Sequence, residues 1–185
     1  LSFEPSSIVN GNINGGGGSN RLTLKGDVGS DDTLEGDLSN FATLEKTGDG
    51  RWTITRPLND FAQVDVIKGT LALTGNNKGS NSRVYVADEG TLEGSSSSLP
   101  SESNIHGNIG NIANDGLVRF VQDEDGVYRG MISNSGAVEK TGRGTLTLDP
   151  DENFGNSYHG GTILTQGTLA LKGDHGIGAA YGALT

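Results

Sequence analysis

A repeated segment constrains the fold of this chain more than any other feature of its sequence. The later copy reads GAVEKTGRGTLTL at 136–148 and, after a loop, GGTILTQGTLAL at 160–171. The earlier copy reads TLEKTGDGRWTI at 43–54 and, after a loop, VDVIKGTLAL at 64–73. The later copy is longer only in the loop, while the flanking segments keep their pattern. Length variation confined to a loop is typical of a repeat architecture.

The flanking segments of each copy alternate between apolar and polar residues. Leu146 and Leu148 alternate with threonines, and Leu71 and Leu73 alternate with Thr70 and an alanine. Strict period-2 alternation predicts half-buried β-strands rather than helices, and glycines between the segments mark tight turns. One such strand cannot bury its apolar side alone. We therefore expect successive coils to stack, each strand pairing with the coil above and below it.

The fold expected from this pattern is an all-β solenoid, a single parallel β-helix segment over 1–185. Coils of roughly 20–25 residues would give about seven to nine turns. Within it, 1–20 is expected to be an irregular N-terminal stretch, 43–73 and 136–171 are homologous units, and 172–185 is expected to be a truncated last coil. The side chains expected in the core are Leu44, Trp52, Ile54, Val64, Val66, Leu71, Leu73, Val138, Leu146, Leu148, Leu164, Leu169 and Leu171.

Composition favours a solenoid over a compact globular domain. The chain has 185 residues, 31 of them glycine, with 32% hydrophobic and only 5% aromatic residues. A globular domain of this length normally carries more large apolar side chains. Disorder is the alternative for such a polar chain, but the regular Leu, Val and Ile doublets argue against it. A thin column of core residues with glycine at the corners satisfies both observations.

Charge and cysteine content limit the partners and the means of stabilisation. The formal net charge is −10, so nucleic acids and anionic membrane surfaces are poor partners. Cysteine is absent, so stability must come from stacking alone. No apolar run approaches the length of a membrane span and no signal peptide opens the chain. The start at Leu1 agrees either with a mature secreted protein that has lost its signal or with an excised fragment, and we expect the chain to be a piece of a longer protein.

The extended motif resembles a known repeat. Its parts are VEKTGRGTLTL at 138–148, YHGGT at 158–162 and GTLAL at 167–171, joined by GTLEG at 90–94 and NDG at 114–116. Together they closely resemble the passenger-associated transport repeat, or autotransporter-associated β-strand repeat, of bacterial autotransporters of the type V secretion pathway. The first copy departs from the pattern: Trp52 stands in the place of a leucine, and the Tyr-x-Gly-Gly-Thr segment is missing before Val64.

The resemblance implies a right-handed parallel β-helix that is a fragment of a longer passenger. Such passengers are carried to the outer membrane of a Gram-negative bacterium by a C-terminal β-barrel, which would lie outside these residues. They are typically adhesins, self-association factors or stalks, displayed on the cell surface or secreted. The implied partners are glycans or proteins of a host cell or matrix, or other copies of the passenger. The lack of cysteine is similar to the habit of the family.

Candidate catalytic groups are few. His106, His159 and His175 lie in expected loops, with no nucleophile elbow and no helical histidine pair. The serine run 95–98 predicts a flexible polar loop. The sequence therefore predicts no catalytic residue, no cofactor and no enzymatic activity.

Two acidic tips are the strongest candidates for a binding site. Asp123, Glu124 and Asp125 form the first, and Asp149, Asp151 and Glu152 form the second. Clustered carboxylates can bind Ca²⁺ or act as acid and base in polysaccharide cleavage, whereas solvated turns are the simplest interpretation. The weak calcium candidates are Asp123, Asp125, Asp149 and Asp151. The residues expected in loops that contact a ligand or partner are Asp123, Glu124, Asp125, Tyr158 and His159.

Two further pairs recur at equivalent places in the repeat, Glu45–Lys46 and Glu139–Lys140. Each is expected to form a surface ion pair or to clamp a turn.

Three functions remain open from the sequence. The first is a non-enzymatic adhesin or self-association rod, whose loops at 55–63, 95–104, 122–127 and 149–158 vary in length as a binding face would. The second is a β-helical enzyme that cleaves polysaccharide. The third is a passive stalk for an active domain elsewhere.

Overall fold

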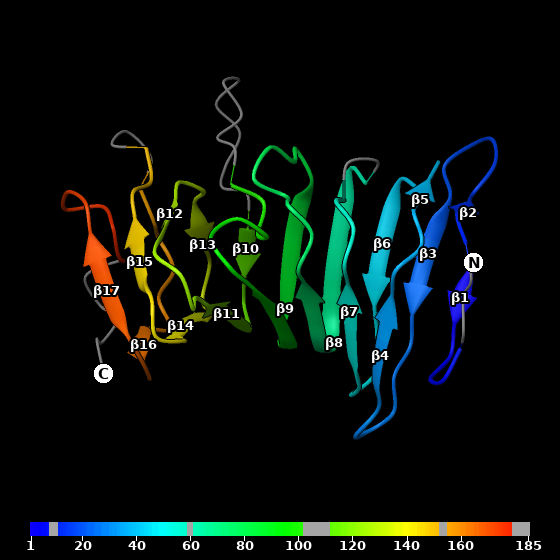
Figure 1. Ribbon diagram of the computed structural model, residues 1–185, viewed down its shortest axis with the longest axis horizontal. Helices are drawn as coiled ribbons and strands as arrows, with labels where there is room; N and C mark the ends of the chain where they lie inside the picture. Colours follow the sequence, from blue (N-terminus) through cyan, green and yellow to red (C-terminus); the bar gives the residue numbers. More distant parts are fainter. Residues whose placement is uncertain (8–10, 59–60, 102–111, 152–154, 179–185) are drawn as a thin grey trace.

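The chain forms a stack of parallel β-strands along one long axis (Figure 1). The structure is a computed structural model that describes residues 1–7, 11–58, 61–101, 112–151 and 155–178. These ranges contain strands, turns and bends and no helix. Every strand pair is parallel, as the pairing of β8 with β9 illustrates. The predicted all-β solenoid is confirmed, with about seven turns; the right-handed winding stays a prediction.

Three columns of strands make up the stack. Column one contains β1 (Ser2–Phe3), β3 (Arg21–Leu24), β6 (Thr43–Lys46), the first parts of β8 (Gln63–Leu73) and β9 (Arg83–Gly94), β10 (Ile112–Asn114) and β13 (Ile132–Ser133). Column two contains β4 (Asp31–Leu34), β7 (Arg51–Ile54), the second parts of β8 and β9, β11 (Leu117–Val121), β14 (Ala137–Thr141) and β16 (Thr162–Leu164). Column three contains β12 (Gly126–Tyr128), β15 (Thr145–Leu148) and β17 (Thr168–Leu171). In addition, β2 (Ile13–Asn14) pairs with β5 (Leu38–Ser39).

The core is a set of aligned rows of aliphatic side chains inside the coil. In column one the register places one row in direct succession and all of its members are at most 3% exposed: Leu22, Leu44, Val64, Val84, Ile112 and Ile132. Because successive side chains of a strand point to opposite faces, every second residue enters this interior. The alternation seen in the sequence therefore sets both the inward face and the register of the stack.

Most of the residues that the sequence assigns to the core lie inside the coil. The fully enclosed ones are Leu44, Trp52, Ile54, Val64, Val66, Leu71, Leu73, Val138, Leu146 and Leu148. The prediction was wrong for Leu164 and Leu171, which are 39% and 44% exposed, and Leu169 is only partly buried. β16 and β17 are the last strands of their columns among the described residues, so no coil within the described ranges covers these inward side chains.

The glycine that opens each Gly-Thr-Leu-Ala-Leu segment lies where two coils touch at a corner. Gly69 and Gly167 have φ angles of 72° and 78°, in the left-handed region that favours glycine. A Cβ atom on Gly69 would lie 2.4 Å from the carbonyl oxygen of Gly48, and one on Gly167 would lie 2.3 Å from that of Gly142. The repeat therefore needs glycine here for two independent reasons, its backbone conformation and its contact with the coil below.

Asparagine side chains join neighbouring coils at two places in the stack. The backbone N–H of Leu58 donates to Asn77 Oδ1 (2.7 Å), and Asn77 Nδ2 donates to the carbonyl oxygen of Ser98 (2.8 Å). Asn77 is 1% exposed, so these bonds satisfy a buried amide while joining three coils. Asn156 forms a similar pair of bonds later in the stack, but beside column one: it accepts from the backbone N–H of Ile132 and donates to the carbonyl oxygen of Gly176.

The two copies of the repeat occupy different sides of the solenoid. Lys46 ends β6 in column one, whereas Lys140 lies in β14 in column two. In both copies the strand that follows the lysine lies one column further on: β7 is in column two and β15 is in column three. The repeat therefore describes one corner of a coil with its flanking strands, and it can be used at more than one corner.

Candidate functional site

The two repeat lysines are the most unusual charged residues of the structure. Lys46 and Lys140 are both 0% exposed and occupy inward positions of their strands. The register places Lys46 between Leu24 and Val66. Buried charges occur in proteins when hydrogen bonds satisfy them, so the partners of each amine decide what it does.

Each amine fills a cage of three backbone carbonyl oxygens at a corner. Lys46 Nζ donates to the carbonyl oxygens of Thr47 (2.9 Å), Gly48 (2.8 Å) and Lys68 (3.0 Å). Lys140 Nζ donates in the same way to Thr141, Gly142 and Gln166, at 2.8, 2.6 and 3.0 Å. An ammonium group has three N–H donors and no acceptor, so each cage satisfies it fully and joins one turn to the next coil.

These contacts decide between the two interpretations of the repeated Glu-Lys pair. The lysines clamp turns, and the glutamates point outward to arginines on neighbouring coils. Glu45 pairs with Arg21, and Glu139 Oε2 lies 2.6 Å from Arg119 Nε. The pair is thus split between the inside and the outside of the coil.

Burial sets the protonation behaviour of both clamps. Desolvation lowers the pKa of Lys46 to about 8, while the nearby charge of Asp49 acts in the opposite direction. Desolvation also lowers the pKa of Lys140, opposed by Asp123. Because all three donors of each ammonium are engaged and the side chains are enclosed, the geometry gives these lysines a structural role.

The first acidic tip is a turn between β11 and β12 that caps the next coil. Asp123, Glu124 and Asp125 are exposed. The backbone N–H of Thr145 donates to Asp125 Oδ1 (2.7 Å), and this bond lowers the pKa of Asp125. The carboxylate thus serves to bind a backbone N–H on the adjacent coil.

The second tip lies at the other end of column three. Asp149 Oδ2 lies 3.2 Å from both Arg129 Nη2 and Lys172 Nζ. Asp149 directly follows β15 and Asp125 directly precedes β12, and these two strands pair with each other. The strands therefore hold the two sets of carboxylates apart. Within the described ranges no group of three or more His, Cys, Asp or Glu residues is placed to hold a metal ion; Glu152 lies outside those ranges.

Removing the charges of the first acidic tip distinguishes between two interpretations of it, a solvated turn and a calcium site. The double variant Asp123→Asn, Asp125→Asn is expected to melt close to the wild-type temperature, because asparagine keeps an oxygen for the N–H of Thr145. Melting followed by circular dichroism, with calcium and with chelator, measures this. A calcium-dependent melting temperature in the wild type that disappears in the variant would contradict the interpretation as a turn.

Tyr158 and His159, the two other residues predicted to contact a partner, differ in their exposure to solvent. The prediction was wrong for Tyr158, which is 1% exposed and forms a 2.7 Å hydrogen bond between its hydroxyl and Thr162 Oγ1. His159 is exposed, and its Nδ1 lies 3.0 Å from the carbonyl oxygen of Asn134. Alternation along the chain explains the difference, since adjacent residues face opposite sides.

The remaining sequence candidates are unremarkable turns or lie outside the described ranges. His106 is outside, and His175 is exposed. The sequence predicts a flexible polar loop for the serine run. The run forms a packed turn instead, in which Ser96 and Ser98 are 5% and 3% exposed and Ser98 Oγ accepts a bond from the N–H of Ser95.

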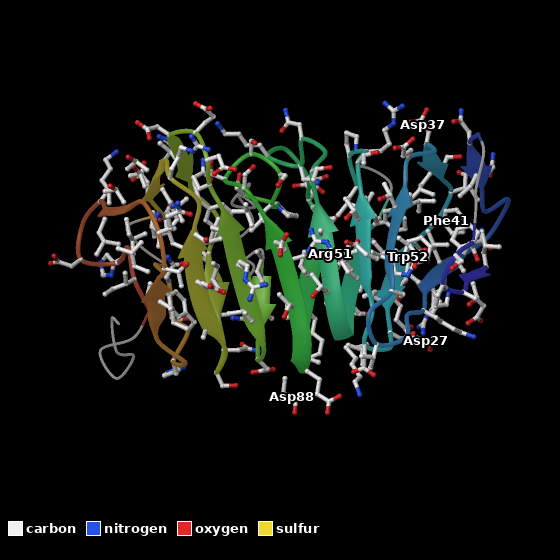
Figure 2. All side chains as sticks on the ribbon, turned by 60° about the horizontal axis from the view of Figure 1, so that its bottom comes forward. Asp27, Asp37, Phe41, Arg51, Trp52 and Asp88 are labelled. Atoms are coloured by element: carbon white, nitrogen blue, oxygen red, sulfur yellow. The ribbon has the colours of Figure 1, made fainter. Side chains whose placement is uncertain are left out.

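The outer surface carries ion pairs that the sequence did not reveal. Figure 2 shows Arg51 near the middle of the long axis, beside the inward Trp52, with Asp27 and Asp88 toward one edge and Asp37 toward the other. Arg51 pairs with Asp31 and Glu93 on two other coils. No sequence signal links Arg51 with its two partners, because the lengths of the intervening loops determine which outward residues of different coils lie side by side.

Comparison with known proteins identifies the repeat. The family model of the passenger-associated-transport-repeat matches residues 138–171, the segment that carries the Lys140 clamp and the Gly167 corner. No curated protein and no solved structure gives a significant match to the chain. No helix among the described residues is long and apolar enough to cross a membrane. The chain therefore carries a passenger-associated transport repeat within a β-solenoid, a combination that fits a segment of an autotransporter passenger.

Proposed function

We propose that this chain is a non-enzymatic segment of an autotransporter passenger that acts as an adhesive or self-associating rod. It would be displayed on, or secreted from, a Gram-negative bacterium. Its partners would be glycans or proteins of a host cell or matrix, or other copies of the passenger. The repeat match at 138–171 supports the passenger assignment, and the continuous stack of about seven turns supports the rod.

The observation that carries the proposal is the way in which the polar groups of the repeat are used. The amines of Lys46 and Lys140 bind backbone carbonyls, and Asp125 and Asp149 bind groups on neighbouring coils. These side chains hold one coil to the next. The side chains at the tip 123–125 and His159 lie at the surface, where they are available to a partner.

Attachment of the isolated fragment tests the proposal. Beads coated with the chain are expected to adhere to host cells or matrix, or to clump with one another, whereas beads coated with an unrelated acidic protein are not. A variant with Asp123→Asn, Glu124→Gln, Asp125→Asn and His159→Ala should keep its circular dichroism spectrum and adhere less. Sugar release from a panel of polysaccharides would contradict the non-enzymatic assignment.

The alternative function is a passive stalk that presents an active domain elsewhere in a longer protein. It has the same fold and the same repeat, so only binding separates it from the first. Natively folded fragment that neither adheres to cells or matrix nor clumps would favour the stalk.

A further inference from the structure

Charged side chains of alternating sign lie along the outer face of column two, on every strand from β4 to β14 except β8. They come from β4, β7, β9, β11 and β14, and we call them the charge ladder: Asp31, Arg51, Glu93, Arg119 and Glu139. Each side chain points outward because its strand neighbours alternate with it into the core.

Four ion pairs connect the ladder. Arg51 Nε lies 3.5 Å from Asp31 Oδ1, and Arg51 Nη2 lies 2.7 Å from Glu93 Oε1. Arg119 Nη1 lies 3.5 Å from Glu93 Oε2, and Arg119 Nε lies 2.6 Å from Glu139 Oε2. Each arginine thus bridges two carboxylates, and Glu93 bridges both arginines.

One of these pairs passes over a whole coil. The register places Ala72 of β8 between Thr53 of β7 and Glu93 of β9, so Arg51 and Glu93 lie on coils that are not neighbours. Ala72 is at an outward position, between the inward Leu71 and Leu73, yet it is only 1% exposed. The Arg51–Glu93 pair crosses β8, whose residues in register with Arg51 and Glu93 are Thr70 and Ala72. A methyl side chain at Ala72 leaves room for these longer side chains to meet.

Two of the three carboxylates of the ladder are partly sheltered from solvent, whereas the side chain of Asp31 is 67% exposed. The side chains of Glu93 and Glu139 are 15% and 16% exposed, and those of Arg51 and Arg119 are 33% and 34% exposed. Isolated, fully exposed ion pairs contribute little, whereas networks with good geometry contribute more. Their attraction still weakens with added salt, since the Debye length falls from about 30 Å at about 0.01 M to about 3 Å at about 1 M.

We propose that the charge ladder is a clamp, sensitive to ionic strength, that couples coils from β4 to β14 into one cooperative unit. In a solenoid each coil normally contacts only its neighbours. The Arg51–Glu93 pair adds a contact between non-neighbouring coils and joins two shorter ion-pair groups into one. The resistance of the rod to unfolding is therefore expected to fall as salt rises.

Thermal melting between about 0.01 M and about 1 M NaCl tests the role of the charge ladder. Wild-type protein is expected to melt at lower temperature as salt rises. Arg51→Gln should lower the low-salt melting temperature by about 3 °C and flatten the salt dependence. Arg83→Gln is the matched control, because Arg83 is exposed and forms no ion pair with the described residues, so it should keep the wild-type dependence.

A second variant breaks the bridge without removing a charge. Ala72→Val should place extra methyl groups under the Arg51–Glu93 pair and flatten the salt dependence as Arg51→Gln does. The proposal is overturned if wild-type melting is independent of salt. It is also overturned if Arg51→Gln and Ala72→Val keep the wild-type slope.

Discussion

Replacement of Trp52 by alanine is expected to lower the free energy of unfolding by about 3–5 kcal/mol, the range measured for buried aromatic side chains. Trp52 is 0% exposed and is the largest enclosed side chain. Its ring stacks on Phe3 with centroids 6.3 Å apart, and its Nε1–H donates to the carbonyl oxygen of Lys25. The alanine variant would leave a cavity between coils and an unpaired carbonyl at a corner.

Chemical denaturation followed by far-ultraviolet circular dichroism measures this effect, since the variant lacks the only tryptophan. Trp52→Phe is the matched control: it keeps most of the ring but loses the N–H donor, and about 1 kcal/mol of loss is expected for the missing hydrogen bond. Equal, small losses in both variants would contradict the enclosed position of Trp52.

The sequence allowed the fold to be predicted because the stack is built from local patterns. The alternation at Leu146 and Leu148 identifies strands and their inward face without any knowledge of partners. The same rule fails for Leu164 and Leu171, which alternate correctly but are 39% and 44% exposed. Alternation gives the direction of a side chain, whereas burial also needs a coil on the next level.

The lysine clamps could have been found from the same alternation. Lys46 follows the inward Leu44 by two residues, and Lys140 follows the inward Val138 by two, so both fall on the inner face. A charged residue at a core position, followed by Thr-Gly-x-Gly, indicates that the turn itself supplies the acceptors. From the sequence alone a surface ion pair remains an alternative, because lysine is seldom fully buried.

The charge ladder could not have been predicted in this way. Arg51 and Glu93 are 42 positions apart, and their contact depends on the length of every loop between β7 and β9. Loop lengths vary within this repeat, so the register of distant strands follows only from the complete stack. Local motifs therefore fix the corners, while the pairing of outward charges is a property of the assembled solenoid.

Replacement of Lys46 by methionine should cost about 2–3 kcal/mol. Methionine has a similar length and is apolar, so the inward position stays filled, but three carbonyl oxygens at the corner lose their donor. An unsatisfied buried polar group costs about 1–3 kcal/mol, and this outweighs the relief of no longer burying a charge. Lys68→Met is the matched control: Lys68 is an outward residue that pairs with Asp49 and Glu89 at the surface, and its loss should change stability little.

The pH dependence of stability tests whether the amine of Lys46 contributes through its charge state and not only through packing. Because burial lowers the pKa of Lys46 to about 8, below the value of about 10.4 in the unfolded chain, the unfolded state binds more protons between these two pH values. Stability therefore rises with pH in that window, and the difference between wild type and Lys46→Met should widen from about pH 8 to about pH 10. Denaturation midpoints across this range measure it. If the difference in stability between wild type and Lys46→Met is constant over this range, the three carbonyls keep the ammonium charged. If Lys46→Met is more stable than wild type at pH 7, the structural role proposed for Lys46 is wrong.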